Sequence, residues 1–114
     1  MSRPPRRAGG RAEALRPFRI PCSPHLAARL EGGHIDAASL ARECRSAALK
    51  DGITLFEGAG GPYVPLSDSE YMLDLMRELR LPVVLVAGNR LGCISHALMA
   101  LDVLENAGLD VAGM

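Results

Sequence analysis

Apolar positions recur at helical spacing in two segments of the first half of the chain. Ser23 and Pro24 predict the N-cap and the first residue of a short helix over 24–30, because proline is tolerated where no N–H partner is needed. Asp36 can cap a second helix over 37–50, which the glycine at position 52 ends. The expected buried face of this second helix comprises Ala37, Leu40, Ala41, Cys44, Ala47 and Ala48.

A third helix is indicated by a capping box. Ser67 and Glu70 have the spacing of this motif, in which each side chain caps the other residue's backbone, and the helix is expected to continue through Arg80. Its apolar residues fall on one stripe and are expected to be buried: Tyr71, Met72, Leu75, Met76 and Leu79.

The last helix is expected from residue 93 or 94 to about residue 106. Gly108 would cap its C-terminus, because glycine adopts the left-handed conformation that ends many helices. Leu109 then begins a further strand, and the sequence stops inside it at Met114. A sheet that ends within a strand indicates an incomplete fold.

Two apolar runs without helical spacing predict β-strands. The first covers 53–57, and the second covers 83–87, where the residues are almost purely aliphatic. A strand that is apolar on both faces is typical of a parallel sheet covered by helices. The alternation of helices and strands therefore predicts the α/β class, with a parallel sheet and flanking helices.

The composition excludes several kinds of protein. The chain has 114 residues, enough for one domain, and its formal net charge of zero gives no electrostatic support for nucleic-acid binding. No apolar run approaches the roughly 20 residues of a membrane span, and no signal-peptide pattern is present. The three cysteines lack C-x-x-C spacing, so we expect reduced thiols in a cytoplasmic protein.

Residues 1–17 differ in composition from the rest of the chain. Five arginines alternate there with proline, glycine and alanine, and the apolar positions have no regular period. We expect a disordered basic tail, with a basic interaction arm as the alternative. The folded domain is then expected to cover residues 18–114.

The first candidate site follows the strand at 53–57. Glu57 ends that strand, and three of the next four residues are glycines, which let the backbone turn sharply and approach a ligand. Ligands of open α/β sheets bind at such strand ends, where a carboxylate suits Mg²⁺ and successive amides cradle phosphate. Glu57 with Gly58, Gly60 and Gly61 therefore indicates a magnesium–phosphate site. A plain turn, whose glycines only supply positive φ angles, remains the alternative.

The second candidate site lies where the last helix begins. The free backbone N–H groups of Gly92, Cys93, Ile94 and Ser95 would point toward an anion placed there. The alternative is an ordinary loop in which Ser95 serves only as the N-cap.

Several motifs together resemble the dethiobiotin synthetase family. They occur in the family's order over about Phe18 to Met114, and their combination is specific although each alone is weak. The motifs are Cys22-Ser23-Pro24-His25-Leu26-Ala27-Ala28, Glu57-Gly58-Ala59-Gly60-Gly61-Pro62-Tyr63-Val64-Pro65-Leu66, Leu81-Pro82-Val83-Val84-Leu85-Val86, Leu91-Gly92-Cys93-Ile94-Ser95-His96-Ala97-Leu98 and Ala107-Gly108-Leu109-Asp110-Val111-Ala112-Gly113.

The resemblance implies an α/β fold of the P-loop NTPase type, usually a homodimer, and a ligase of biotin biosynthesis. The family uses ATP and Mg²⁺ to close the ureido ring of dethiobiotin from 7,8-diaminopelargonate and CO₂, through a phosphorylated carbamate. By resemblance, Glu57 would bind Mg²⁺, and Glu57, Gly58, Ala59 and Gly60 would border the ATP phosphates and the carbamate. The substrate would be held by Gly60 and by the helix-start residues Gly92, Cys93, Ile94 and Ser95.

The sequence also departs from the family pattern. It contains no Walker A motif, and Lys50, its only lysine, lies on the outside of a predicted helix. The catalytic lysines that the family carries near its N-terminus, and its C-terminal nucleobase-binding part, have no counterpart, so no catalytic residue is assigned. We expect the chain alone to have little or no ligase activity. The alternative function is a catalytically dead P-loop-like remnant that acts as a dimerisation or regulatory module.

Overall fold

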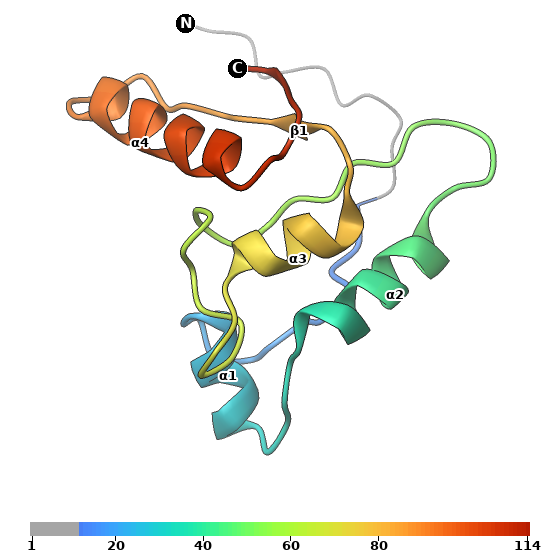
Figure 1. Ribbon diagram of the computed structural model, residues 1–114. Coiled ribbons are helices and arrows are strands. Elements are labelled where there is room, and N and C mark those ends of the chain that lie inside the picture. The colour runs from blue at the N-terminus through green and yellow to red at the C-terminus, as the bar shows by residue number, and fades with distance from the viewer. Residues whose placement is uncertain (1–11) are drawn as a thin grey trace, which may run out of the picture.

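A computed structural model describes residues 12–114; residues 1–11 of the expected basic tail lie outside the described residues. The order of elements is α1 (Pro24–Leu30), α2 (Ala37–Ala47), α3 (Met72–Leu79), β1 (Val83–Val84), α4 (Cys93–Asn106) and β2 (Val111–Gly113). Figure 1 shows α1, α2 and α3 on one side of the β1–β2 pair and α4 on another.

The two strands pair in parallel, as the sequence predicts for an α/β chain. Val83 lies opposite Val111, and the backbone N–H of Leu85 donates to the Gly113 carbonyl at 2.9 Å. Helix α4 connects the two strands. Its Leu104 side chain is buried, with only 1% of the residue exposed. The helix ends at the glycine predicted for it, because Gly108 has a φ of +71° and donates to the Glu105 carbonyl at 2.9 Å.

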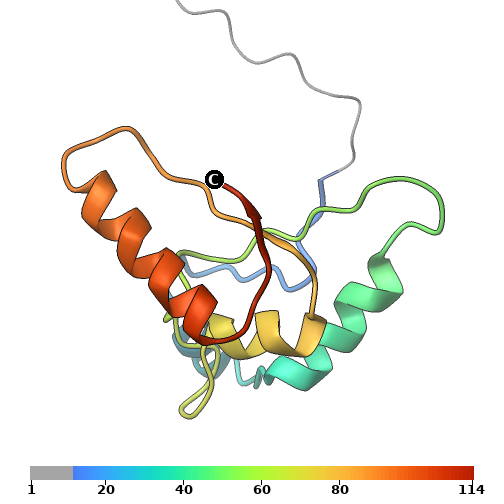
Figure 2. The same ribbon diagram turned by 45° about the horizontal axis from the view of Figure 1, so that its top comes forward.

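The best buried part of the molecule is the layer formed by α1, α2 and α3. Helices α2 and α3 pack on each other, as Figure 2 shows from a second direction. The buried cluster between them consists of Ala28, Ile35, Ala37, Ala41, Leu66, Met72 and Leu75. Small residues on α2, Ala37 and Ala41, let the larger side chains of α3, Met72 and Leu75, pack closely against that helix.

The predicted starts of the first two helices are correct, and one predicted end is wrong. The Asp36 carboxylate accepts the Ser39 N–H at 2.7 Å and caps α2 as expected. At the start of α1 the Ser23 carbonyl accepts the Ala27 N–H at 3.0 Å, but its side chain makes no cap bond. Helix α2 ends at Ala47 rather than residue 50, because Ala48 turns to extended backbone with a ψ of 136°.

The capping box predicted at Ser67 and Glu70 does not begin α3. The Ser67 Oγ does accept the Glu70 N–H, at 3.2 Å, but the Glu70 carbonyl accepts the Leu66 N–H at 2.8 Å and closes a separate turn. The helix begins at Met72, where the Asp74 carboxylate accepts the Tyr71 N–H at 2.8 Å. The acid three residues after Tyr71 therefore caps the helix in place of Glu70.

The predicted strand over 53–57 is wrong, and the strand over 83–87 is shorter than predicted. The first segment has no regular secondary structure, no described segment pairs with it, and Ile53 and Leu55 are 86% and 84% exposed. Only Val83 and Val84 form β1, and Val86 is 88% exposed. A strand requires a partner for its N–H and carbonyl groups, which an apolar sequence alone cannot supply.

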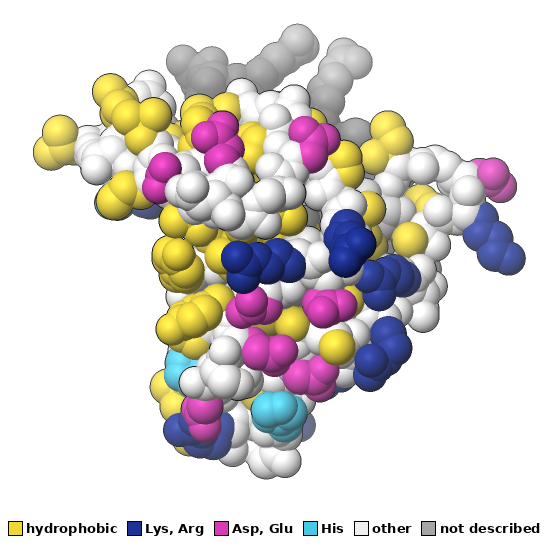
Figure 3. Space-filling model, viewed as in Figure 1, with side chains coloured by type: hydrophobic (Ala, Val, Ile, Leu, Met, Phe, Trp, Pro, Cys, Tyr) yellow, Lys and Arg dark blue, Asp and Glu magenta, His cyan; other side chains and the backbone are white. Residues whose placement is uncertain are grey.

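Hydrophobic and charged side chains are distributed unevenly over the surface. Figure 3 shows hydrophobic side chains gathered over one end of α4, whereas acidic and basic side chains alternate over α2 and α3. Among the helices of residues 12–114, none has the length and apolar content needed to cross a membrane.

Candidate functional site

The loop that follows Glu57 is anchored on the first turn of α3. The Val64 carbonyl accepts the Met72 N–H, and the Pro62 carbonyl accepts the Leu73 N–H, both at 2.8 Å. These bonds satisfy two backbone donors that the first turn of a helix otherwise leaves free. The start of α3 is therefore occupied by the chain itself and is not open to an anion.

Close packing disfavours a side chain at two glycines of this loop. Gly60 has a φ of +70°, and a Cβ atom there would lie 2.6 Å from Cγ2 of Val64. A Cβ atom at Gly58 would lie 3.1 Å from the Sδ of Met72. Gly61, in contrast, has open space around its Cα. The glycine loop, defined here as residues 57–61, thus has a packing role at positions 58 and 60.

Glu57 is exposed at the start of the glycine loop, and within residues 12–114 it forms no hydrogen bond or ion pair. No group of three or more His, Cys, Asp or Glu side chains in that range could hold a metal ion. A lone exposed carboxylate fits Mg²⁺ only as one ligand of an ion whose other ligands are water and phosphate oxygens, which is how Mg²⁺ is commonly held.

The predicted anion site at the start of α4 is partly open. Gly92 is the N-cap, with a φ of +89°, so the alternative in which Ser95 is the N-cap is wrong. The Cys93 N–H donates to the Arg90 carbonyl at 3.0 Å and is therefore not free. Among the described residues, the N–H groups of Ile94 and Ser95 have no acceptor. The Gly92 N–H also has no acceptor among these residues, so three of the four amides remain available, at the positive end of the helix dipole.

The two candidate segments do not form one site in this structure. The glycine loop packs on α3, whereas α4 contacts β2. Figures 1 and 2 both show the start of α4 at its outer end, directed away from α1, α2 and α3. A ligand that used both segments would therefore need a different placement of one of them or a second copy of the chain.

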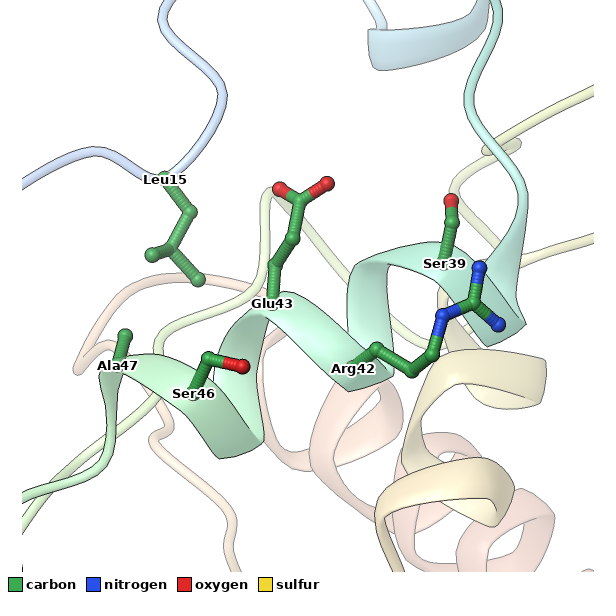
Figure 4. A pocket seen from close by; sticks show the side chains of 6 residues that line it. All are labelled: Leu15, Ser39, Arg42, Glu43, Ser46 and Ala47. Atoms are coloured by element: carbon green, nitrogen blue, oxygen red, sulfur yellow. The ribbon is translucent and has the colours of Figure 1, made fainter.

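Two hollows lie elsewhere on the surface, and neither includes a predicted site residue. The first, shown in Figure 4, is a shallow depression along α2 beneath Leu15, lined also by Ser39, Arg42, Glu43, Ser46 and Ala47. The Arg16 Nε donates to the Glu43 carboxylate at 2.8 Å, and this bond lowers the pKa of Glu43. Nothing in the sequence signals this hollow, because Leu15 and Arg16 lie within the segment expected to be disordered.

The second hollow lies between α1 and the turn at 66–69. Its lining includes His25, Arg29, His34 and Asp68, and an ion pair joins Arg29 to Asp68. The Nδ1 atom of His25 is buried and has no hydrogen-bond partner among the described residues. Because that atom is shielded from solvent, it does not present a donor or acceptor to a ligand in the open hollow.

Comparison with known proteins identifies relatives for nearly the whole chain. The family described as AAA domain matches residues 9–114. The chain is 50% identical over 91 residues to the ATP-dependent dethiobiotin synthetase of Cellvibrio japonicus. The aligned region covers 80% of the chain and 40% of that protein. It is 46% identical over 115 residues to the enzyme of the same name from Caulobacter vibrioides, covering 95% of the chain and 52% of that protein. The chain thus spans about half the length of the curated relatives it matches.

Proposed function

Because the chain belongs to the AAA-domain family, we propose that it provides the glycine-loop half of an ATP-dependent dethiobiotin synthetase site. The observation that carries the proposal is its 44% to 50% identity to proteins that bear this name. These relatives confirm the resemblance to dethiobiotin synthetases that the sequence motifs predict. The motifs include both candidate segments.

The glycine loop is proposed to hold the magnesium–nucleotide phosphates. Glu57 would supply one oxygen ligand to Mg²⁺, and the amides of Gly58, Ala59 and Gly60 would face phosphate oxygens or the carbamate. The exposure of Glu57 and its lack of a partner in the described chain support this role. The Mg²⁺ ion would supply positive charge beside the transferred phosphoryl group.

The start of α4 is proposed to hold the carboxylate of the substrate, together with Gly60 of a second copy of the chain. The free N–H groups of Ile94 and Ser95 at the positive end of the helix support this assignment. Gly92 would let the backbone reach the carboxylate, and Cys93 could donate its N–H only after releasing the Arg90 carbonyl.

The reaction of the complete enzyme would close a urea ring in the cytoplasm. One amine of 7,8-diaminopelargonate captures CO₂ as a carbamate, ATP phosphorylates the carbamate, and the second amine attacks the activated carbon and releases phosphate. In this chain the charge that develops on the phosphoryl group has no lysine beside it, because Lys50 is the only lysine and lies in an exposed turn after α2. We therefore expect little or no turnover by the chain alone.

A second copy of the chain is the proposed partner at α4. Leu91, Ile94 and Leu98 are between 59% and 105% exposed, and the last two lie four residues apart on one helix face. Exposed apolar patches of this kind mark interaction surfaces. The same patch supports the alternative function, a dimerisation or regulatory module without catalysis.

The proposal is tested by giving the purified chain ATP, Mg²⁺, bicarbonate and 7,8-diaminopelargonate. We expect saturable binding of diaminopelargonate by calorimetry, with dethiobiotin formation far below enzyme rates by mass spectrometry. Binding of neither the substrate nor magnesium–ATP would overturn the proposal and favour the non-catalytic module. Turnover at an ordinary enzyme rate would overturn the expected inactivity.

A further inference from the structure

The glycine loop is held from one side only. Among the described residues, no backbone N–H or carbonyl of residues 50–60 forms a hydrogen bond. The backbone bonds that fix the loop lie at its last residue and beyond it, where the carbonyls of Gly61, Pro62 and Val64 accept. The position of Glu57 therefore depends on where the first turn of α3 lies, and not on a sheet.

The first turn of α3 is in turn connected to α2 through Glu70. The Glu70 carboxylate Oε2 accepts the Ala37 N–H at 3.1 Å, which is the first amide of α2. Ala37 is 1% exposed, so water cannot easily replace this acceptor. The two residues are 33 positions apart. A second side-chain hydrogen bond, from Arg45 to the Glu78 carbonyl, joins α2 to the other end of α3.

The turn that carries Glu70 is itself closed by several bonds. The Glu70 carbonyl accepts the Leu66 N–H at 2.8 Å, and its own N–H donates to Ser67 Oγ at 3.2 Å. Pro65 and Tyr71 form an antiparallel bridge across the turn. Val64 and Met72 adjoin this turn, and the hydrogen bond between them anchors the glycine loop. A displacement of Glu70 is therefore expected to move this anchor.

We propose that Glu70 is a positioning residue that fixes the glycine loop by accepting the first amide of α2. Its negative charge at the N-terminus of α2 adds to the capping by Asp36, because both carboxylates lie at the positive end of the helix dipole. The inference rests on the proposed function only in giving the loop a role in phosphate binding. The placement of the loop is a property of the chain without any ligand.

The test uses the full ¹⁵N-labelled chain with Glu70→Ala, and with Glu70→Gln, which keeps an acceptor oxygen. We expect Glu70→Ala to speed hydrogen exchange at the Ala37 amide by roughly tenfold and to shift the amide resonances of Gly58, Gly60 and Gly61. Glu70→Gln should restore the exchange rate to within roughly threefold of the wild type.

Two controls separate positioning from general destabilisation. Glu78→Ala removes a carboxylate from the exposed face of α3, and Arg42→Gly lowers helix stability at an exposed position of α2. Neither should move the glycine resonances. Unchanged exchange at Ala37 in Glu70→Ala, or equal glycine shifts in Arg42→Gly, would overturn the proposal. Failure of the wild type to bind magnesium–ATP would instead overturn the proposed function and leave these readouts intact.

Discussion

Gly60 lies so close to Val64 that a Cβ atom on the glycine would be 2.6 Å from Cγ2 of the valine. Because Gly60 also has a φ of +70°, Gly60→Ala should lower the free energy of unfolding by about 2 kcal/mol, measured by urea denaturation. Gly61→Ala is the matched control, since its Cβ would meet no atom within 4 Å. Equal effects of the two substitutions would contradict the packing described for the loop.

A second substitution separates the two causes at Gly60. Val64→Ala removes the Cγ2 atom that a Cβ at Gly60 would strike, but it leaves the backbone angle unchanged. The double variant should therefore recover part of the stability lost by Gly60→Ala, in a double-mutant cycle. Strict additivity of the two losses would show that the steric contact contributes nothing.

The Asp36 cap predicts a pH dependence of stability. Hydrogen bonds from the Ser39 backbone N–H and side chain hold the pKa of Asp36 below its usual value. A lowered pKa in the folded state means that the stabilisation is present above the unfolded pKa and is lost as the pH falls through the folded one. Thermal midpoints measured from pH 7 to pH 3 should fall more steeply for the wild type than for Asp36→Asn, which keeps a cap acceptor but does not titrate.

When an anion binds at the start of α4, the backbone amides there should change their chemical shifts by unequal amounts. The N–H groups of Ile94 and Ser95 are free, whereas that of Cys93 donates to the Arg90 carbonyl. In a titration with 7,8-diaminopelargonate followed by amide chemical shifts, Ile94 and Ser95 should move more than Cys93. Movement of Cys93 alone, or of residues spread over the whole chain, would contradict an anion site at this helix start.

The three thiols should differ in reactivity. Cys22 is exposed, Cys93 is half-buried, and Cys44 is buried in α2, where burial raises the pKa of its thiol. Alkylation at neutral pH, followed by mass spectrometry of peptides, should modify Cys22 first and Cys44 only when the protein is unfolded. Early modification of Cys44 would show that the α2–α3 layer opens readily.

The sequence predicts the helices of this chain better than its strands. Helix ends depend on neighbours in sequence, so Pro24, Asp36 and Gly108 all act where the pattern places them. The strand at 53–57 depends on a partner elsewhere, and no described residue supplies one. Apolar composition could not reveal that absence.

The sequence predicts the backbone conformation of the candidate loop at one position but not its contacts. Glycine at position 60 signals a positive φ, which the structure contains, but the sequence gives no sign that Val64 excludes a side chain there. The spacing of Ser67 and Glu70 predicts a capping box at α3, yet the Glu70 carboxylate accepts the first amide of α2, 33 residues earlier. Contacts over such separations depend on how the layers pack, which short-range patterns do not specify.

The central claim is that the glycine loop binds magnesium–nucleotide phosphate, and amide chemical shifts of the labelled chain test it most directly. Titration with ATP and Mg²⁺ should shift Gly58, Ala59 and Gly60 saturably, and Glu57→Gln should weaken the apparent affinity by roughly tenfold through loss of one charged metal ligand. Glu105→Gln, an exposed carboxylate change on α4, should leave the titration unchanged. No saturable shift in the loop, or an equal response in Glu57→Gln and the wild type, would contradict the claim.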